Sequence, residues 1–389
     1  MKKVIVVFHD NNIKSGATAS MLSLIKYWKT HNYFEVEAII PKDKGSLAGE
    51  LDKFSINYYI FNYNMVRYHV DNNIGTRALK YLRAFFRVIR DIFTVFNLRG
   101  NRIFNNVDYI YSNTSSIYFG FFLSQILCIK HVWHFREFGF EDQNCKHIFS
   151  DHFFYKLANK YSDKIIVISR SLEEKIRKYI DGKKIFQVYN GIDSKNIIKK
   201  NEISLKNKSP LRLIITGSVI PNKGQEFVIE ALYQLKLRNI PFQLGIAGDG
   251  KSSYVNYLKE KCNKYNIAES VNFHGFVSNM ETILDNYDIA IISSKSEAFG
   301  RVTVESMIMG LLIVCSNTGA NKELVSDENG YIYMGNSTKS LVDILEYIYF
   351  QDEIFKLDKI KKSMEVSNKF TVDLCAKSIY RILIDCHSN

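Results

Sequence analysis

Residues 288–309 read DIAIISSKSEAFGRVTVESMIM and contain the stretch that decides the fold. Asp288–Ile292 is short, apolar and rich in β-branched residues, so it is predicted to be a buried strand. Gly300 marks a turn, and the run after it is predicted to be a helix with Val304 and Met307 on its apolar side. A strand that turns directly into a helix directs backbone N–H groups and the positive end of the helix dipole above the sheet, which suits a phosphate.

Two carboxylates, Glu297 and Glu305, stand eight positions apart in this stretch. Glu297 precedes the helix and Glu305 lies more than a turn into it, so one can bind the hydroxyls of a sugar and the other those of a ribose. A phosphate site flanked by two such carboxylates indicates a nucleotide-sugar. The alternative interpretation is an ordinary surface helix with two solvated acids.

The phrase Glu-Ala-Phe-Gly at residues 297–300 and the spacing of Glu297 and Glu305 resemble the E-x7-E signature of the retaining glycosyltransferases of family four. The resemblance implies the GT-B fold, which is an α/β architecture of two Rossmann-like domains facing across a cleft. It also implies that Glu297 holds the sugar hydroxyls and Glu305 the ribose. Phe299 and Gly300 would present backbone N–H groups to the donor phosphates.

The length and composition of the chain are those of a globular protein with more than one domain. The chain has 389 residues, which suggests two or three domains, and 46% of them are hydrophobic, enough for substantial cores. No signal peptide is expected at the N-terminus, and the longest apolar stretch, about residues 117–129, is too short to span a bilayer. The six cysteines form no C-x-x-C pair, as is typical of reduced thiols. The sequence therefore predicts a cytoplasmic protein that does not cross a membrane by itself.

The net charge of +12 is distributed unevenly. Residues 1–200 hold 31 of the 52 basic residues and 18 of the 40 acidic ones, so all of the excess lies in this half. A basic half can meet nucleic acid, anionic lipid or an acidic substrate. No signature of a nucleic-acid-binding fold is present, so nucleic acid is not expected as a partner.

Strand-like and helical runs alternate along the chain, which predicts doubly wound parallel sheets. Residues 1–200 are expected to form the N-terminal, acceptor-binding Rossmann-like domain, and residues 201–370 the C-terminal domain that binds the nucleotide-sugar. The polar run of residues 199–210 is the predicted linker. The last helix, about residues 371–389, is expected to pack back on the first domain. The predicted strands are residues 4–8, 36–40, 57–61, 107–112, 131–135, 164–169 and 185–189, then 211–216, 242–247, 271–274, 288–293 and 312–315.

The segment Arg77–Arg102 combines basic residues at helical spacing with many aromatic and aliphatic ones. One interpretation is a helix that rests on an anionic membrane surface or holds an acidic, lipid-linked acceptor. The other is a core helix with one solvated face. On the first interpretation the protein is expected to be cytoplasmic and peripheral on the inner face of the cell membrane, and on the second it is expected to be cytoplasmic without that contact.

Residues 217–224, GSVIPNKG, follow the first strand of the second domain. The glycine turn at Gly217 and the lysine near a helix start suit a diphosphate. In the family that the chain resembles, a Lys stands before the final Gly and an Arg or Lys at the second position. Lys223 matches, whereas Ser218 takes the place of the second cation, which removes one fixed positive charge from the leaving-group site.

Two segments of the first domain resemble further family motifs. Gly16 opens the first helix where the family carries a Gly-Gly pair, and Ser15 stands in place of the first glycine. The segment that contains His134 and Arg136 resembles the family's H-x-R-E motif at a strand end. The resemblance implies that His134 binds the sugar and that Arg136 contacts phosphate or acceptor. The alternative is a histidine and an ion pair that are satisfied within the fold.

Two loops of the second domain complete the predicted donor site. Gly248 lies in a loop that resembles one near the nucleotide, and Phe276 lies in a segment, residues 274–277, that resembles the one whose backbone meets the base in the family. No Asp-x-Asp motif occurs, so no metal ion and no cofactor is expected, and the phosphate charge is predicted to meet Lys223 and the helix dipole.

The resemblance predicts a retaining, metal-independent hexosyltransferase with a nucleoside diphosphate sugar as donor, a UDP-sugar in preference to a GDP-sugar. The expected acceptor is lipid-linked or a polysaccharide, in bacterial synthesis of cell-surface polysaccharide such as capsule or lipopolysaccharide. Two alternatives remain open. One is a catalytically weakened partner subunit, suggested by Ser218 and Ser15, and the other is a nucleotide-sugar epimerase of the same fold.

Overall fold

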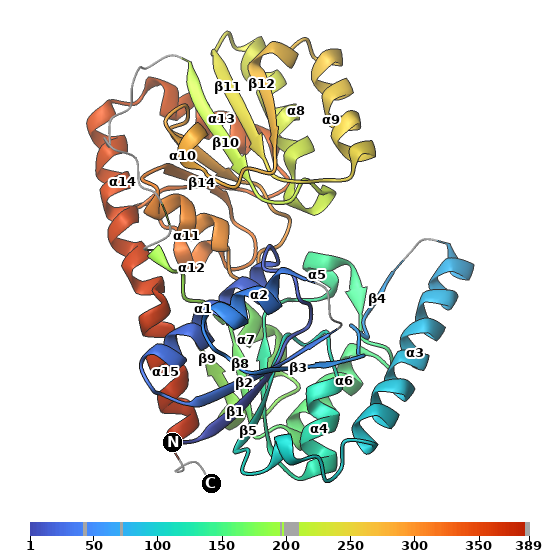
Figure 1. The fold of residues 1–389 in the computed structure, drawn as a ribbon. Helices are drawn as coiled ribbons and strands as arrows, with labels where there is room; N and C mark the ends of the chain where they lie inside the picture. The colour runs from blue at the N-terminus through green and yellow to red at the C-terminus, as the bar shows by residue number, and fades with distance from the viewer. Residues whose placement is uncertain (42–44, 71–72, 195–196, 198–209, 386–389) are drawn as a thin grey trace. The chain divides into compact units, whose positions relative to one another are not determined.

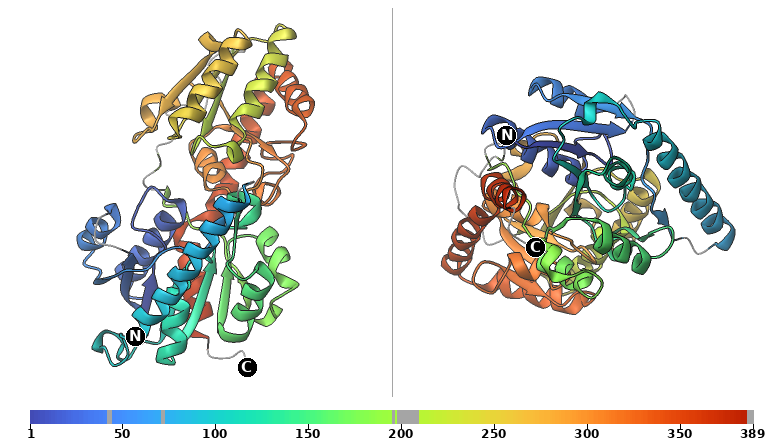
Figure 2. Two further views of the ribbon diagram at one scale, coloured as in Figure 1. Left: turned by 90° about the vertical axis from the view of Figure 1, so that its right-hand side faces the viewer. Right: turned by 90° about the horizontal axis from the view of Figure 1, so that it is seen from below.

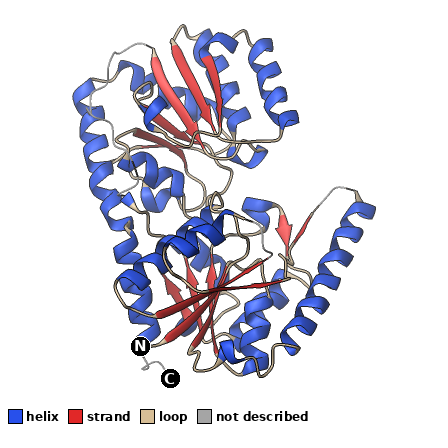
Figure 3. Ribbon diagram, viewed as in Figure 1, coloured by secondary structure: helices blue, strands red, loops and turns tan. Residues whose placement is uncertain are grey.

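The computed structural model describes residues 1–41, 45–70, 73–194, 197 and 210–385. Its chain divides into two compact units, residues 1–191 with 372–389, and residues 192–371. Each unit is built on a parallel sheet with helices on both faces (Figures 1 and 3). The predicted α/β class is confirmed, and the predicted linker lies almost entirely outside the described residues.

Unit 1 holds a seven-stranded sheet in the order β3-β2-β1-β5-β6-β8-β9, in which every neighbouring pair is parallel. The strands are β1 (Lys3–Val7), β2 (Glu35–Pro41), β3 (Tyr58–Phe61), β5 (Tyr109–Asn113), β6 (Lys130–Phe135), β8 (Lys164–Val167) and β9 (Ile185–Gln187). The helices are α1 (Gly16–Thr30), α2 (Ser46–Lys53), α3 (Ile74–Phe96), α4 (Phe119–Leu127), α5 (Phe140–Gln143), α6 (Asp151–Tyr161), α7 (Arg170–Arg177) and α15 (Val372–Ile384).

The alternation of side chains along β1 supplies both faces of this sheet. Val4 and Val6 pack in one cluster with residues of α1 and α15, while Ile5 and Val7 pack in another with residues of α3 and α4. A parallel strand buried on both faces must be apolar throughout, which is why the run Lys3–Val7 carries no polar residue after its first.

The last helix, α15, packs on α1. The indole Nε1 of Trp28 donates to the Ala376 carbonyl at 3.4 Å, and the hydroxyl of Tyr27 bonds the Asp373 carboxylate. Lys2 Nζ and the Tyr109 hydroxyl both donate to the carbonyl of Leu383. The final helix of the chain is therefore part of the core of unit 1.

Unit 2 holds a six-stranded parallel sheet in the order β12-β11-β10-β13-β14-β15. The strands are β10 (Leu211–Thr216), β11 (Phe242–Ala247), β12 (Val271–Gly275), β13 (Ile289–Ile292), β14 (Leu312–Ser316) and β15 (Tyr331–Tyr333). The helices are α8 (Gln225–Leu237), α9 (Ser252–Lys264), α10 (Glu281–Leu284), α11 (Arg301–Ile308), α12 (Asn321–Leu324), α13 (Thr338–Phe350) and α14 (Glu353–Ser367).

Three strands were not predicted. Two of them, β4 (Tyr68–His69) and β7 (Cys145–Lys146), form a short antiparallel pair, and the third is β15 at the edge of the second sheet. Each has only two or three residues, so no period of hydrophobic residues can be read along it. Among the described residues, no helix is long and apolar enough to cross a membrane.

Candidate functional site

In both sheets the strand order reverses next to the first strand. In unit 2 the chain runs outward from β10 to β11 and β12, and then returns to place β13 on the other side of β10. Ligands of doubly wound sheets bind at such a point, beyond the carboxyl ends of the two strands. The loops that leave β10 and β13 carry Lys223 and Glu297.

Lys223 and Glu297 form an ion pair at this point of reversal. The Lys223 Nζ lies 2.5 Å from the Glu297 Oε1, and the Ser294 hydroxyl donates to the same oxygen at 3.2 Å. Both side chains remain partly accessible, 28% for the lysine and 13% for the glutamate. They line a small cavity together with Thr216, Ser293, Ser294 and Val302. The structure thus brings together two residues that lie 74 positions apart in the chain.

The backbone of each loop is fixed to its neighbour. The Ser293 hydroxyl donates to the carbonyl of Lys223 at 2.7 Å, and the Lys295 N–H donates to the carbonyl of Asn222 at 2.9 Å. Because these bonds join the loop after β10 to the loop after β13, the position of the lysine relative to the glutamate is set by backbone and not by the ion pair alone.

A third loop, after β14, holds the backbone of Glu297. The Ala320 N–H donates to the Glu297 carbonyl at 2.8 Å. Gly319 has a φ of +54°, and a Cβ there would lie 2.2 Å from the same carbonyl oxygen. Only glycine permits this close approach in a left-handed conformation.

The other predicted glycines of unit 2 meet at the carboxyl ends of β10 and β11. The Gly217 N–H donates to the Ala247 carbonyl at 2.9 Å, and the Gly248 N–H donates to the Gly275 carbonyl at 2.7 Å. A Cβ on Gly248 would lie 1.8 Å from the Gly217 carbonyl oxygen, so the two loops can touch only with glycine at position 248. Phe276 follows directly, with half of its side chain exposed.

The helix α11 begins at Arg301, directly after the turn at Gly300 that the sequence predicts. The first N–H groups of a helix have no partner within the helix, so the start of α11 presents donors beside Glu297. Phe299 is buried against Phe370, with ring centroids 5.8 Å apart, so its ring is not available to a ligand. Glu305 pairs with Arg301, at 2.8 Å between Nη2 and Oε1.

Unit 1 has its own point of reversal between β1 and β5. Directly after β1, His9 Nε2 lies 3.2 Å from Asp10 Oδ2 and 3.3 Å from the Ser15 hydroxyl, next to Gly16 at the start of α1. Thr18 donates to the other oxygen of Asp10. Burial alone would raise the pKa of Asp10, but the hydrogen bonds of His9 and Thr18 outweigh it and lower that pKa.

This cluster was missed by the sequence reasoning. The available signal was position: His9 and Asp10 are the first polar residues after a predicted strand, at the edge where ligands of such sheets bind. They belong to no motif of the family that the chain resembles, so the resemblance does not indicate them.

His134 and Arg136 lie at the carboxyl end of β6, in a buried network of unit 1. The imidazole Nδ1 of His134 lies 2.8 Å from the Tyr111 hydroxyl and 3.1 Å from Arg136 Nη2. The Arg136 Nε donates to Asn113 at 2.6 Å, and Nη1 donates to Asn190. Burial, together with the nearby Arg136 guanidinium, lowers the pKa of His134 well below its ordinary value, so the ring is neutral. The Nε2 of His134 finds no hydrogen-bond partner among the described residues.

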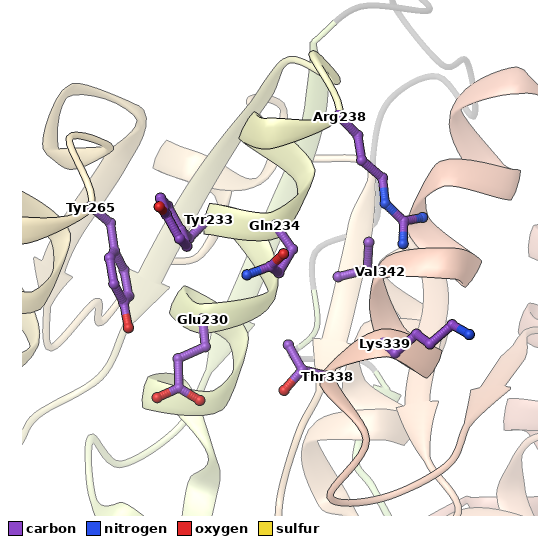
Figure 4. A pocket seen from close by; sticks show the side chains of 8 residues that line it. All are labelled: Glu230, Tyr233, Gln234, Arg238, Tyr265, Thr338, Lys339 and Val342. Carbon is purple, nitrogen blue, oxygen red and sulfur yellow. The ribbon is translucent and has the colours of Figure 1, made fainter.

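A separate hollow of about 440 Å³ lies between α8 and α13 of unit 2. Tyr233 and Tyr265 stack at its side, with centroids 4.5 Å apart, and Arg238 reaches over it toward α13 (Figure 4). None of the predicted site residues lines it, and Arg238 is already paired with Asp343 and Glu346. It is distinct from the Lys223–Glu297 site.

Solved structures similar to this chain share its architecture over nearly all of its length. HepE of Anabaena, crystallised with UDP, superposes with a TM-score of 0.73 at 20% identity and covers 98% of this chain and 99% of its own. The lipopolysaccharide outer core galactosyltransferase WaaB superposes with a TM-score of 0.73 at 15% identity, covering 97% of this chain and 98% of its own. The fold is GT-B.

Comparison of sequences agrees with the GT-B fold. Residues 196–362 match the family model of glycosyl transferases group 1. An uncharacterised glycosyltransferase of Methanocaldococcus jannaschii is 23% identical over 334 residues, which are 84% of this chain and 89% of that protein. The O-antigen biosynthesis glycosyltransferase WclY of Escherichia coli is 24% identical over 192 residues, about half of each chain.

Proposed function

We propose that this protein is a retaining glycosyltransferase that moves a hexose-type sugar from a nucleoside diphosphate donor to a lipid-linked or polysaccharide acceptor, without a metal ion. The observation that carries the proposal is the Lys223–Glu297 pair, held by backbone at the point of strand reversal beside the start of α11. This arrangement offers a cation, helix N–H groups and a carboxylate to one ligand, which are the groups that a diphosphate and a sugar require.

In the proposed reaction, the bond between the sugar and the diphosphate breaks and negative charge develops on the departing nucleoside diphosphate. Lys223 and the first N–H groups of α11 stabilise that charge. A fixed donor aimed at a developing anion lowers a barrier by about 3–4 kcal/mol. Glu297 binds sugar hydroxyls, and its fixed backbone orients the sugar. The acceptor hydroxyl attacks on the face from which the diphosphate leaves, and its proton passes to the departing phosphate oxygen.

Similar proteins support the proposed sugar donor and the proposed role in polysaccharide synthesis. HepE has been crystallised with UDP-glucose as well as with UDP, and WclY is an O-antigen biosynthesis glycosyltransferase. We therefore propose a UDP-sugar as donor and bacterial cell-surface polysaccharide as the product.

The test is a screen of UDP- and GDP-sugars for hydrolysis and transfer by the wild type, Lys223→Ala and Lys361→Ala proteins. Lys361 is an exposed lysine of α14 and serves as the control. The proposal expects release of the nucleoside diphosphate by the wild type and the control, and a loss of about 100-fold or more in Lys223→Ala. Equal turnover by folded Lys223→Ala would refute it.

The alternative of a catalytically weakened partner subunit rests on Ser218, whose side chain is exposed beside the glycine turn. Calorimetric titration with UDP and GDP distinguishes it from an enzyme. A subunit without a donor site would bind neither nucleotide, whereas the proposed transferase binds at least one.

A further inference from the structure

The helix α3 turns an apolar stripe away from the core of unit 1. Beyond Ile74 at its first position, its exposed large hydrophobic side chains are Leu79, Leu82, Phe86, Phe93 and Phe96, and we call this set of five the outward stripe. Phe86 and Phe93 are 65% and 66% exposed. These values argue against the core-helix interpretation, because three of the four phenylalanines of the helix are exposed.

The buried residues of α3 are a different set. They are Ala84, Val88, Asp91 and Val95, spaced four, three and four residues apart. The outward stripe follows the same helical spacing at residues 79, 82, 86 and 93, and at about 100° per residue its centre lies on the side of the helix opposite to the buried set. The helix runs along the outside of unit 1, as Figures 1 and 2 show.

Basic side chains border the outward stripe. Arg83, Arg87 and Arg90 lie along one side of it at helical spacing, and Arg77 and Lys80 add to the charge of the helix. Asp91 is the single acidic residue of α3, and it belongs to the buried set. The accessible face of the helix is therefore apolar at its centre and cationic at its border.

Two further aromatic side chains enlarge this surface. Phe149 and Phe153 are each 49% exposed, and their ring centroids lie 5.5 Å apart. Phe85 of α3 contacts Phe149 with centroids 6.3 Å apart, which connects this pair to the helix.

We propose that the outward stripe of α3 docks on the surface of an anionic lipid bilayer, with the helix lying in the plane of the interface. Aromatic and aliphatic side chains enter the boundary between headgroups and acyl chains, while arginines at the border meet lipid phosphates. Charge complementarity selects this occupant over a second copy of the chain, because two such helices facing each other would bring five basic residues against five. The inference is independent of the transfer reaction.

The test measures binding to vesicles without donor or acceptor, so its outcome does not depend on the proposed activity. Phosphatidylcholine vesicles are compared with mixed phosphatidylcholine and phosphatidylglycerol vesicles, each at low and high salt. The variants are Phe86→Ser with Phe93→Ser, and Arg83→Gln with Arg87→Gln. The matched controls are Phe350→Ser, which changes a phenylalanine that is 73% exposed in unit 2, and Lys361→Gln.

We expect wild type and both controls to sediment with the anionic vesicles at low salt and to be released at high salt. Each double variant should lower the partition coefficient at least tenfold. The proposal is overturned if the wild type ignores anionic vesicles, if the phenylalanine variant binds as tightly as the control, or if the wild type is a dimer that Phe86→Ser with Phe93→Ser dissociates.

Discussion

At the scale of single residues, the candidate site depends on one cation where the family that the chain resembles has two. Lys223 is held against Glu297, while Ser218 is exposed at the second position. A hydrogen bond between a charged donor and a phosphate contributes more than a neutral one, about 1.5–3 kcal/mol. The absent charge should therefore be measurable as affinity for the nucleoside diphosphate.

Ser218→Arg is expected to tighten UDP binding by roughly tenfold or more, because it returns a cation to the glycine turn. Titration calorimetry measures the change, and Ser218→Gln, which adds length without charge, is the control. An equal gain in both variants would show that contact area, and not charge, is responsible.

Gly319→Ala is expected to weaken donor binding and transfer strongly, because its Cβ would displace the carbonyl that positions Glu297. Gly49→Ala is the matched control: it lies in α2 with no atom within 4 Å of an added Cβ and should add up to about 1 kcal/mol of stability. Donor binding by Gly319→Ala that equals the wild type would show that Glu297 is held by other contacts.

At the scale of secondary structure, α3 carries a buried acid under its cationic border. Burial raises the pKa of Asp91 to about 7, although the adjacent Arg90 opposes the shift. The folded protein therefore binds a proton more tightly than the unfolded chain, whose Asp titrates near 4. By linkage, stability falls as the pH rises from about 4 to 7 and this component is constant above that range.

Asp91→Asn should remove this loss. Urea titrations at pH 5 and pH 8 measure the free energy of unfolding of both proteins. The decrease in this free energy from pH 5 to pH 8 should be smaller in the variant than in the wild type, and the difference between the two decreases should be roughly 2–4 kcal/mol. An identical decline in the variant would mean that Asp91 is ionised throughout.

Most elements were predictable because a doubly wound sheet requires apolar runs separated by amphipathic helices, and both signals are local. Strands such as Lys3–Val7 and Leu312–Ser316 can be recognised from their apolar, β-branched composition alone. The contact between Lys223 and Glu297 could not be predicted in this way. A motif indicates which residues belong to a site, but not which of their side chains lie within bonding distance of each other. Likewise, the pattern of α3 is compatible with a core helix or a surface helix, and only its packing decides which face is buried.

At the scale of the whole molecule, the two units can be monitored separately. The chain has two tryptophans, Trp28 and Trp133, and both are fully buried in unit 1. The proposed nucleotide site belongs to unit 2. Tryptophan fluorescence therefore reports the unfolding of one unit while a nucleotide stabilises the other.

UDP at about 100 times its dissociation constant should raise the stability of the unit that binds it by about 2.7 kcal/mol. We expect calorimetry to show an upward shift in the transition of unit 2, with a smaller shift in the midpoint followed by tryptophan fluorescence. Equal shifts in both would indicate that the nucleotide stabilises unit 1 as strongly as unit 2.

The place of α15 in the core of unit 1 has a consequence for biosynthesis. The helix α15 contacts Trp28, and the carbonyl of Leu383 accepts a hydrogen bond from Lys2. All of unit 2 is translated between these two parts of unit 1. While the ribosome makes unit 2, the apolar surface of α1 on which α15 packs therefore remains uncovered. Unit 2 is contiguous in sequence, so all of its residues are available for folding before the last segment of unit 1 has been made.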